Sequence, residues 1–125
     1  MSKKILLIED IADIRRLIRM TIELDDIEIQ EAADGPTGLA MAVASVPDVV
    51  ILDVMMPGGM DGLEVCRRIK GEASLAATKV LMLSARGTSQ DIELATAAGA
   101  DAYLVKPFSP LQLIQVVAGM AFAIV

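Results

Sequence analysis

Five charged or hydroxyl side chains lie within two residues of the end of a short apolar run of this chain: Glu9, Asp10, Asp53, Ser84 and Lys106. Three of them are carboxylates, one is a hydroxyl and one is an amine. If the apolar runs are parallel strands, their carboxyl ends meet at one edge of a sheet and these side chains converge there. Two like charges ~4 Å apart repel by about 4 kcal/mol at an effective dielectric constant of roughly 20. Such a cluster therefore needs a cation or a bound proton.

The oxygen-rich cluster suits a hard cation. Mg²⁺ fits best, because it binds one or two carboxylates, keeps several waters and leaves room for a phosphate oxygen. Lys106 would add a second positive charge and Ser84 a hydroxyl donor. An Asp carboxylate is a competent nucleophile toward phosphorus when a metal neutralises the incoming phosphoryl group. Asp53 is the candidate nucleophile, because the Pro- and Gly-rich loop MMPGGMDG soon turns the chain away and leaves its carboxylate accessible.

The elements that must position these groups alternate along the chain. Apolar runs at 5–8, 27–29, 49–52, 80–83 and 102–105 predict strands, and a helical segment follows each one. Four runs are continuous, which is typical of strands buried on both faces of a parallel sheet, and the second alternates as an edge strand does. This order predicts an α/β fold, a flavodoxin-like doubly wound sheet of five parallel strands with five helices. The expected strand order is 2-1-3-4-5, which puts the first and third strands side by side at the switch point.

The helical segments carry their own signals. The predicted first helix, 12–24, has four aliphatic side chains on one face: Ile14, Leu17, Ile18 and Ile22. Its three arginines are expected to lie away from that face. Asp61 precedes the third helix and is interpreted as a structural cap rather than as part of the acidic site.

The length and composition of the chain limit the classes of protein and of site that are possible. The chain has 125 residues, of which 54% are hydrophobic and 2% aromatic, and this predicts a single domain over 1–125 with an aliphatic core. The net charge of −6 argues against a nucleic-acid surface. One Cys and no His exclude an internal disulfide and a Cys/His zinc site. Any phosphohistidine in the chemistry must therefore belong to a partner.

The two ends of the chain argue against membrane segments. The N-terminal apolar run stops at Glu9, too early for a signal peptide. The apolar segment 111–125 falls short of the ~20 residues of a membrane helix. A cytoplasmic protein is expected. That last segment has only Gln112 and Gln115 as polar side chains, so its outer side needs a cover. Two interpretations of this cover are kept: a second copy of the chain (a homodimer) or another partner, and a segment that follows in the sequence.

Four segments, in this order, resemble the receiver domain of two-component response regulators of the chemotaxis type: LLIEDIADIRRL, DVVILDVMMPGGMDGLEV, VLMLSA and DAYLVKPFSP. The resemblance covers essentially the whole chain. It implies that Asp53 is the phosphoacceptor and that Asp53, Asp10 and the backbone carbonyl of Met55 bind Mg²⁺. Glu9 would bind the ion through water.

The resemblance also implies catalytic roles for Ser84 and Lys106, which would contact the phosphoryl group. Ser84 and Tyr103 would be the switch residues, and the bond before Pro107 would be cis. Met55 and Arg86 lie where the family tunes dephosphorylation. Their bulk predicts a phosphoryl state that outlives that of fast chemotaxis signalling. The loop after Asp53 is one Gly longer than the common form, which affects its geometry.

The implied function is a phosphorylation-switched signalling module. A sensor histidine kinase or histidine phosphotransfer protein would donate the phosphoryl group. The surface of the fourth helix, fifth strand and fifth helix would then change and bind a downstream protein target. Such a domain is not an enzyme in the usual sense, although it assists its own phosphorylation and dephosphorylation.

Other functions are weighed against this one. A phosphorylation-independent pseudo-receiver usually lacks an acidic residue or the lysine, and this chain keeps all of them. A haloacid-dehalogenase-like phosphatase would need a second Asp two residues after the nucleophile, where this chain has Met55. A flavin carrier of the same fold is disfavoured by the scarcity of aromatic residues.

Overall fold

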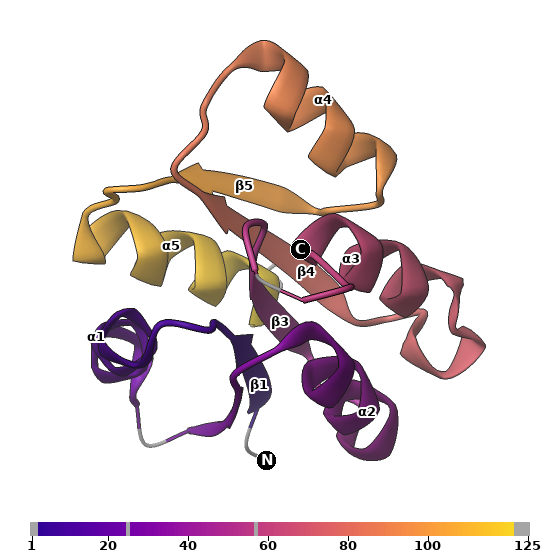
Figure 1. Cartoon of the computed structure of the whole chain (residues 1–125). Helices are drawn as coiled ribbons and strands as arrows, with labels where there is room; N and C mark the ends of the chain where they lie inside the picture. The colour runs from indigo at the N-terminus through magenta and orange to yellow at the C-terminus, as the bar shows by residue number, and fades with distance from the viewer. Residues whose placement is uncertain (1–2, 25, 57, 122–125) are drawn as a thin grey trace.

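A five-stranded sheet forms the middle layer of the molecule, with helices on both of its faces (Figure 1). The computed structural model describes residues 3–24, 26–56 and 58–121. The strands are β1 (Lys3–Ile8), β2 (Ile27–Ala32), β3 (Val49–Asp53), β4 (Lys79–Ser84) and β5 (Ala102–Val105). The helices are α1 (Ala12–Ile22), α2 (Gly35–Ser45), α3 (Gly62–Gly71), the short 3₁₀ helix η1 (Ala73–Leu75), α4 (Ser89–Ala97) and α5 (Pro110–Ala121).

The strands lie in the order β2-β1-β3-β4-β5, and every neighbouring pair is parallel. This confirms the predicted α/β fold and its strand order. In the central pair, Ile8 of β1 lies opposite Leu52 of β3. The next residues, Glu9 and Asp53, therefore reach the carboxyl edge of the sheet at the same level.

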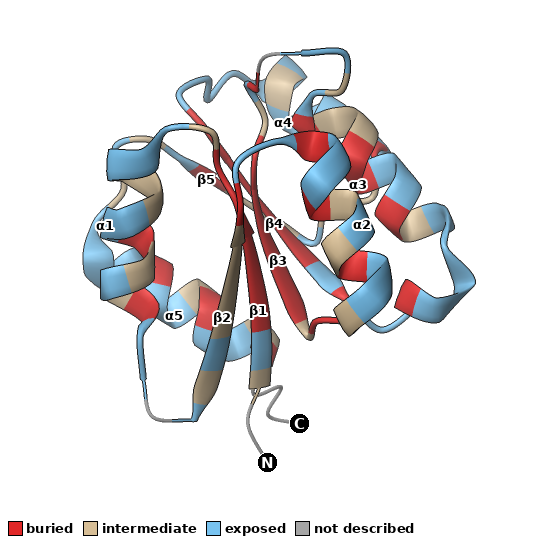
Figure 2. Ribbon diagram, turned by 60° about the horizontal axis from the view of Figure 1, so that its bottom comes forward, coloured by how far each residue is buried: buried red, intermediate tan, exposed pale blue. Residues whose placement is uncertain are grey.

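The core consists of two aliphatic layers, one on each face of the sheet (Figure 2). On one face, α1 and α5 pack on the strands through side chains such as Ile18 and Leu113. On the other face, α2, α3 and α4 pack on the strands through side chains such as Val65 and Ile69 of α3. The three middle strands are buried between these layers, as their continuous apolar runs predicted.

Two predictions of burial were wrong. Leu17 was expected on the core face of the first helix, but it is 60% exposed. Successive helical residues are separated by about 100°, and Ile18 and Ile22 occupy the face that meets the sheet. The fifth strand was expected to be buried on both faces, but its Val105 is 40% exposed because β5 is an edge strand.

The last helix was expected to be apolar and covered on all sides. Its described part, α5, buries Leu113 and Val117, whereas Leu111 is 64% and Ile114 37% exposed. The outer side of α5 is thus uncovered in the described part of the chain, and residues 122–125 lie outside it. Across the described residues, no helix has both the length and the apolar character required to span a bilayer.

The turn from β3 into α3 depends on Asp61 and Gly62. The Oδ1 atom of Asp61 accepts a hydrogen bond from the Glu64 amide at 3.0 Å, which confirms that Asp61 caps α3. Gly62 donates its amide to the Val54 carbonyl at 2.9 Å. A Cβ atom at Gly62 would collide with the Asp53 carbonyl oxygen and lie 2.7 Å from the Val54 Cα. Only glycine lets α3 start this close to the end of β3.

We expect Gly62→Ala to lower the free energy of unfolding by about 3 kcal/mol, because backbone atoms cannot move aside as a side chain can. The measurement is urea denaturation followed by far-ultraviolet circular dichroism. Gly119→Ala in α5 is the matched control, since a Cβ there meets nothing within 4 Å. That control should be neutral or slightly stabilising. Equal stabilities of the two variants would contradict this account of the turn.

Candidate functional site

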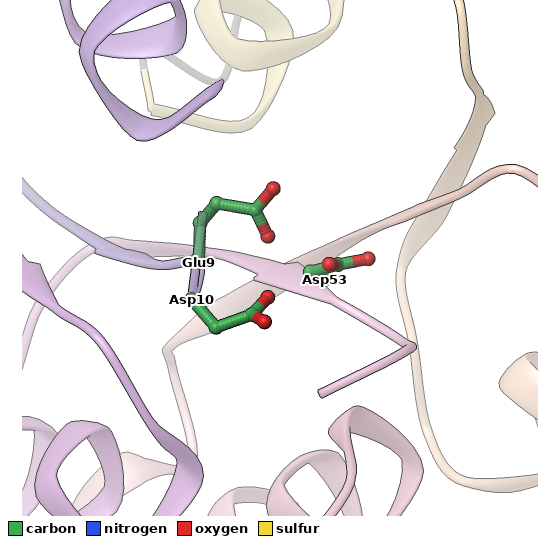
Figure 3. A group of neighbouring side chains, drawn as sticks. All are labelled: Glu9, Asp10 and Asp53. Atoms are coloured by element: carbon green, nitrogen blue, oxygen red, sulfur yellow. The ribbon is translucent and has the colours of Figure 1, made fainter. Parts of the chain in front are cut away.

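Three carboxylates converge where β1 and β3 end (Figure 3). Glu9 and Asp10 follow β1, and Asp53 is the last residue of β3. One oxygen from each of the three lies within 4.8 Å of the others. Glu9 is 1% and Asp53 5% exposed, so water screens their charges poorly. The sequence-based prediction that these three groups meet at one edge of the sheet is confirmed.

The cluster contains carboxylate oxygens that lack hydrogen-bond donors. Glu9 Oε2 and Asp10 Oδ1 are buried, and neither has a hydrogen-bond partner among the described residues. Leaving such oxygens unsatisfied is costly, and a cation among them would satisfy both. An all-oxygen donor set of this kind fits Mg²⁺. Met55, the other expected ligand, donates its amide to Asp53 Oδ1 at a long 3.4 Å, and its side chain is exposed.

Lys106 supplies the positive charge of the cluster. Its Nζ atom lies 3.2 Å from Glu9 Oε1 and 3.4 Å from Asp53 Oδ1. Lys106 follows β5, and its peptide bond to Pro107 is cis. One ammonium group thus lies between two carboxylates, one directly after β1 and one at the end of β3.

Lys106 alone does not balance three carboxylates, and the effect appears in the pKa of Glu9. Burial, followed by the neighbouring carboxylate of Asp53, raises the pKa of Glu9 to about 8, against the opposing effect of Lys106. The carboxyl of Glu9 therefore favours its protonated form at neutral pH. That proton relieves the repulsion that the sequence predicted for this cluster.

Ser84 lies at the same edge of the sheet, at the end of β4, and is fully buried. Its carbonyl accepts the Lys106 amide at 2.7 Å, and its Oγ atom accepts the Arg86 amide at 3.1 Å. Among the described residues, the Ser84 hydroxyl makes no hydrogen bond to Asp53 or Lys106. A hydroxyl that accepts one bond still has its proton free to donate to another group.

A cavity of about 520 Å³ adjoins Ser84, between the loop after β3 and helix α4. The lining includes four residues that the sequence singled out: Met55, Ser84, Arg86 and Tyr103. Tyr103 is half-buried, and its hydroxyl donates to the Arg86 carbonyl at 2.5 Å. The expected switch and tuning residues therefore border one open space beside the acidic cluster.

Sequence reasoning missed Arg15. It was expected only to lie away from the apolar face of the first helix, yet its Nη1 atom donates to the Glu9 carbonyl at 2.7 Å. Its Nε atom donates to Glu31 Oε1 at 3.1 Å. No local signal reveals the contact with Glu31, because Glu31 belongs to strand β2 and lies 16 residues further along the chain than Arg15.

Comparison with known proteins agrees with this geometry. Residues 5–118 match the family model described as the response regulator receiver domain. The chain is 42% identical over 111 residues to the transcriptional regulatory protein ResD of Bacillus subtilis, covering 89% of this chain and 45% of ResD. It is 38% identical over 113 residues to the response regulator PleD of Caulobacter vibrioides, covering 90% of this chain and 25% of PleD.

A solved structure of a chemotaxis protein has the same fold. The fold matches that of the chemotaxis protein CheY4 of Vibrio cholerae with a TM-score of 0.88 and 32% identity, covering 96% of this chain and 99% of CheY4. The chain spans less than half the length of ResD and a quarter of PleD. The family match, which extends over most of the chain, includes every residue of the acidic cluster. This chain belongs to the family of response regulator receiver domains.

Proposed function

We propose that this chain is a phosphorylation-switched signalling module in which Asp53 accepts a phosphoryl group from a phosphohistidine. The observation that carries the proposal is the convergence of Glu9, Asp10 and Asp53 with Lys106 at one edge of the sheet. The buried oxygens without donors support a bound Mg²⁺ at this position. The histidine must come from a partner, a sensor kinase or a phosphotransfer protein, because this chain has no His.

In the proposed reaction, an Asp53 oxygen attacks phosphorus, the phosphorus–nitrogen bond of the donor breaks, and the bonding electrons leave with the imidazole. Asp10, Asp53 and the Met55 carbonyl would hold Mg²⁺ directly, and Glu9 through water. The ion would neutralise charge between the carboxylate and the phosphoryl oxygens. Lys106, already 3.4 Å from Asp53, would pair with a phosphoryl oxygen, and Ser84 would donate its free hydroxyl proton to another.

The proposed switch connects this chemistry to the surface. When Ser84 and its loop move toward the phosphoryl oxygens, the bond from Tyr103 to the Arg86 carbonyl would break and Tyr103 would turn inward. The surface of α4, β5 and α5 would then bind a downstream protein. Exposed apolar side chains on the three elements support this: Leu94, Val105 and Leu111. A second copy of the chain, packed through α5, is a further proposed occupant.

We place this module in the cytoplasm, and we propose that this domain binds neither nucleic acid nor a membrane.

The acceptor is testable by intact mass. With a small phosphodonor and Mg²⁺, the protein should gain ~80 Da, and Asp53→Asn should abolish the gain because the acceptor carboxylate is required. Asp61→Asn is the matched control, since Asp61 is exposed and caps α3. It should keep the gain. A gain that persists in Asp53→Asn would move the acceptor elsewhere, and no gain in the wild type would favour a pseudo-receiver.

Metal binding should release a proton near neutral pH. Glu9 has its pKa raised to about 8 without metal, and a cation beside it should lower that value, so binding should displace close to one proton. Titration calorimetry in two buffers of different ionisation enthalpy measures the number of protons. The apparent Mg²⁺ affinity should rise with pH up to about 8. Glu9→Gln should bind Mg²⁺ without this proton release.

The same carboxyl sets a pH dependence of stability in the metal-free protein. Between the ordinary pKa of 4.5 and about 8, the folded protein holds a proton that the unfolded chain has released. The contribution of Glu9 to the free energy of unfolding should therefore decrease as pH rises through this window. The difference in stability between wild type and Glu9→Gln measures this contribution, and a difference independent of pH would contradict the assignment.

The lifetime of the phosphoryl state should exceed a few seconds, because Met55 and Arg86 obstruct the approach of water. Met55→Ala and Arg86→Ala should each speed dephosphorylation about threefold, less than 1 kcal/mol of barrier. The decay of the phosphorylated mass after removal of the donor gives the rate. Met20→Ala is the control, since Met20 is an exposed Met on α1. A wild-type half-life of a few seconds would overturn this expectation.

A further inference from the structure

The junction between β1 and α1 carries Glu9 and Asp10, yet α1 lacks a side-chain cap. The residue at its N-cap position is Ile11, and it makes no capping hydrogen bond. Elsewhere in the fold, Asp34, Asp61 and Thr88 cap α2, α3 and α4. The segment that must present two carboxylates accurately therefore lacks the restraint that usually fixes the start of a helix.

Two groups at the end of β2 supply a different restraint. The Glu9 amide donates to the Ala32 carbonyl at 3.1 Å. The Glu9 carbonyl accepts from Arg15 at 2.7 Å, and Arg15 donates in turn to Glu31 at 3.1 Å. Both backbone groups of Glu9 are thus held by neighbouring residues of β2, one directly and one through the guanidinium of Arg15.

A second arginine completes the arrangement. Arg19 pairs with the other oxygen of the Glu31 carboxylate. Arg15 is 21% and Glu31 29% exposed, so the pair is partly shielded from solvent and salt. The planar guanidinium suits this task, because it directs donors at fixed angles toward two acceptors at once. A lysine could keep the charge but not this geometry.

We propose that Arg15, held in place by Glu31, is the positioning residue for the acidic pair. The Glu9 carbonyl belongs to the planar peptide that joins Glu9 to Asp10. A restraint on that carbonyl limits rotation of the peptide plane, and with it the movement of the two Cα atoms that carry these side chains. Arg15 acts through this peptide and does not touch the ion. The inference rests on the proposed function, because it assigns Arg15 to the same metal site.

An effect of Arg15 through its charge and an effect through its position predict opposite changes in Mg²⁺ affinity when Arg15 is removed. If Arg15 acted only by its charge, its removal would make the acidic cluster more negative and tighten Mg²⁺ binding. If Arg15 positions the pair, its removal should weaken binding, as the loss of outer partners of metal ligands does. The sign of the change in the Mg²⁺ Kd therefore distinguishes the two roles.

The test measures the Mg²⁺ Kd of the full chain by titration calorimetry, together with amide hydrogen exchange of residues 9–11 in the metal-free protein. We expect Arg15→Ala to raise the Kd about tenfold and to speed exchange of these amides. Arg15→Lys should raise the Kd as well, although it keeps the charge. Arg16→Ala, at the adjacent exposed position, is the matched control and should leave both quantities unchanged.

A double-mutant cycle tests the route through Glu31. Glu31→Gln should weaken Mg²⁺ binding in the wild-type background and have no further effect in Arg15→Ala. Additive effects would show that Glu31 acts by charge alone and would overturn the route. An unchanged or lower Kd in Arg15→Ala would overturn the positioning role. Absence of Mg²⁺ binding by the wild type would instead refute the proposed function on which the inference rests.

Discussion

Repulsion between carboxylates is the constraint around which this molecule is organised. The parallel register of β1 and β3 brings Glu9 and Asp53 to one level, and Asp10 joins them from the following turn. In bulk water such neighbours would be tolerated, but Glu9 and Asp53 are almost completely buried. Folding can bring these groups together only if positive charge or a proton comes with them. Lys106 provides the first, and the raised pKa of Glu9 favours the second.

Rigid neighbours keep this unfavourable arrangement from relaxing. Gly62 lets α3 start against the backbone of Asp53, and Arg15 and Ala32 hold both backbone groups of Glu9. The carboxylates therefore cannot separate without breaking contacts in two layers of the fold. The repulsion between the carboxylates is therefore retained in the folded protein, and a cation bound among them would relieve it.

Sequence reasoning succeeded where structure is local or strongly periodic. The continuous apolar runs predicted the strands, and the polar residue after each run predicted Asp53 and Lys106 at a common edge. It failed where the answer depended on which neighbour covers a surface. Leu17 has the same character as Ile18, and only the placement of α1 on the sheet decides between them. The exposure of Val105 followed from the predicted strand order, which makes β5 an edge, and not from its apolar run. The contact between Arg15 and Glu31 exists only in the tertiary fold.

The sheet has two edges, and the acidic cluster is tied to each of them. Lys106 connects it to β5, and the Arg15–Glu31 pair connects it to β2 on the opposite side. Thermodynamic linkage is reciprocal. If cation binding at the cluster strengthens the contact with Lys106 or with Arg15, the free energy needed to detach the outer strand on that side increases by the same amount. Conversely, a partner that binds an edge strand and strengthens its contact with the cluster would change the affinity of the cluster for a cation. The two opposite edges of the sheet are thus both connected to a single site, one through Lys106 and the other through Arg15 and Glu31.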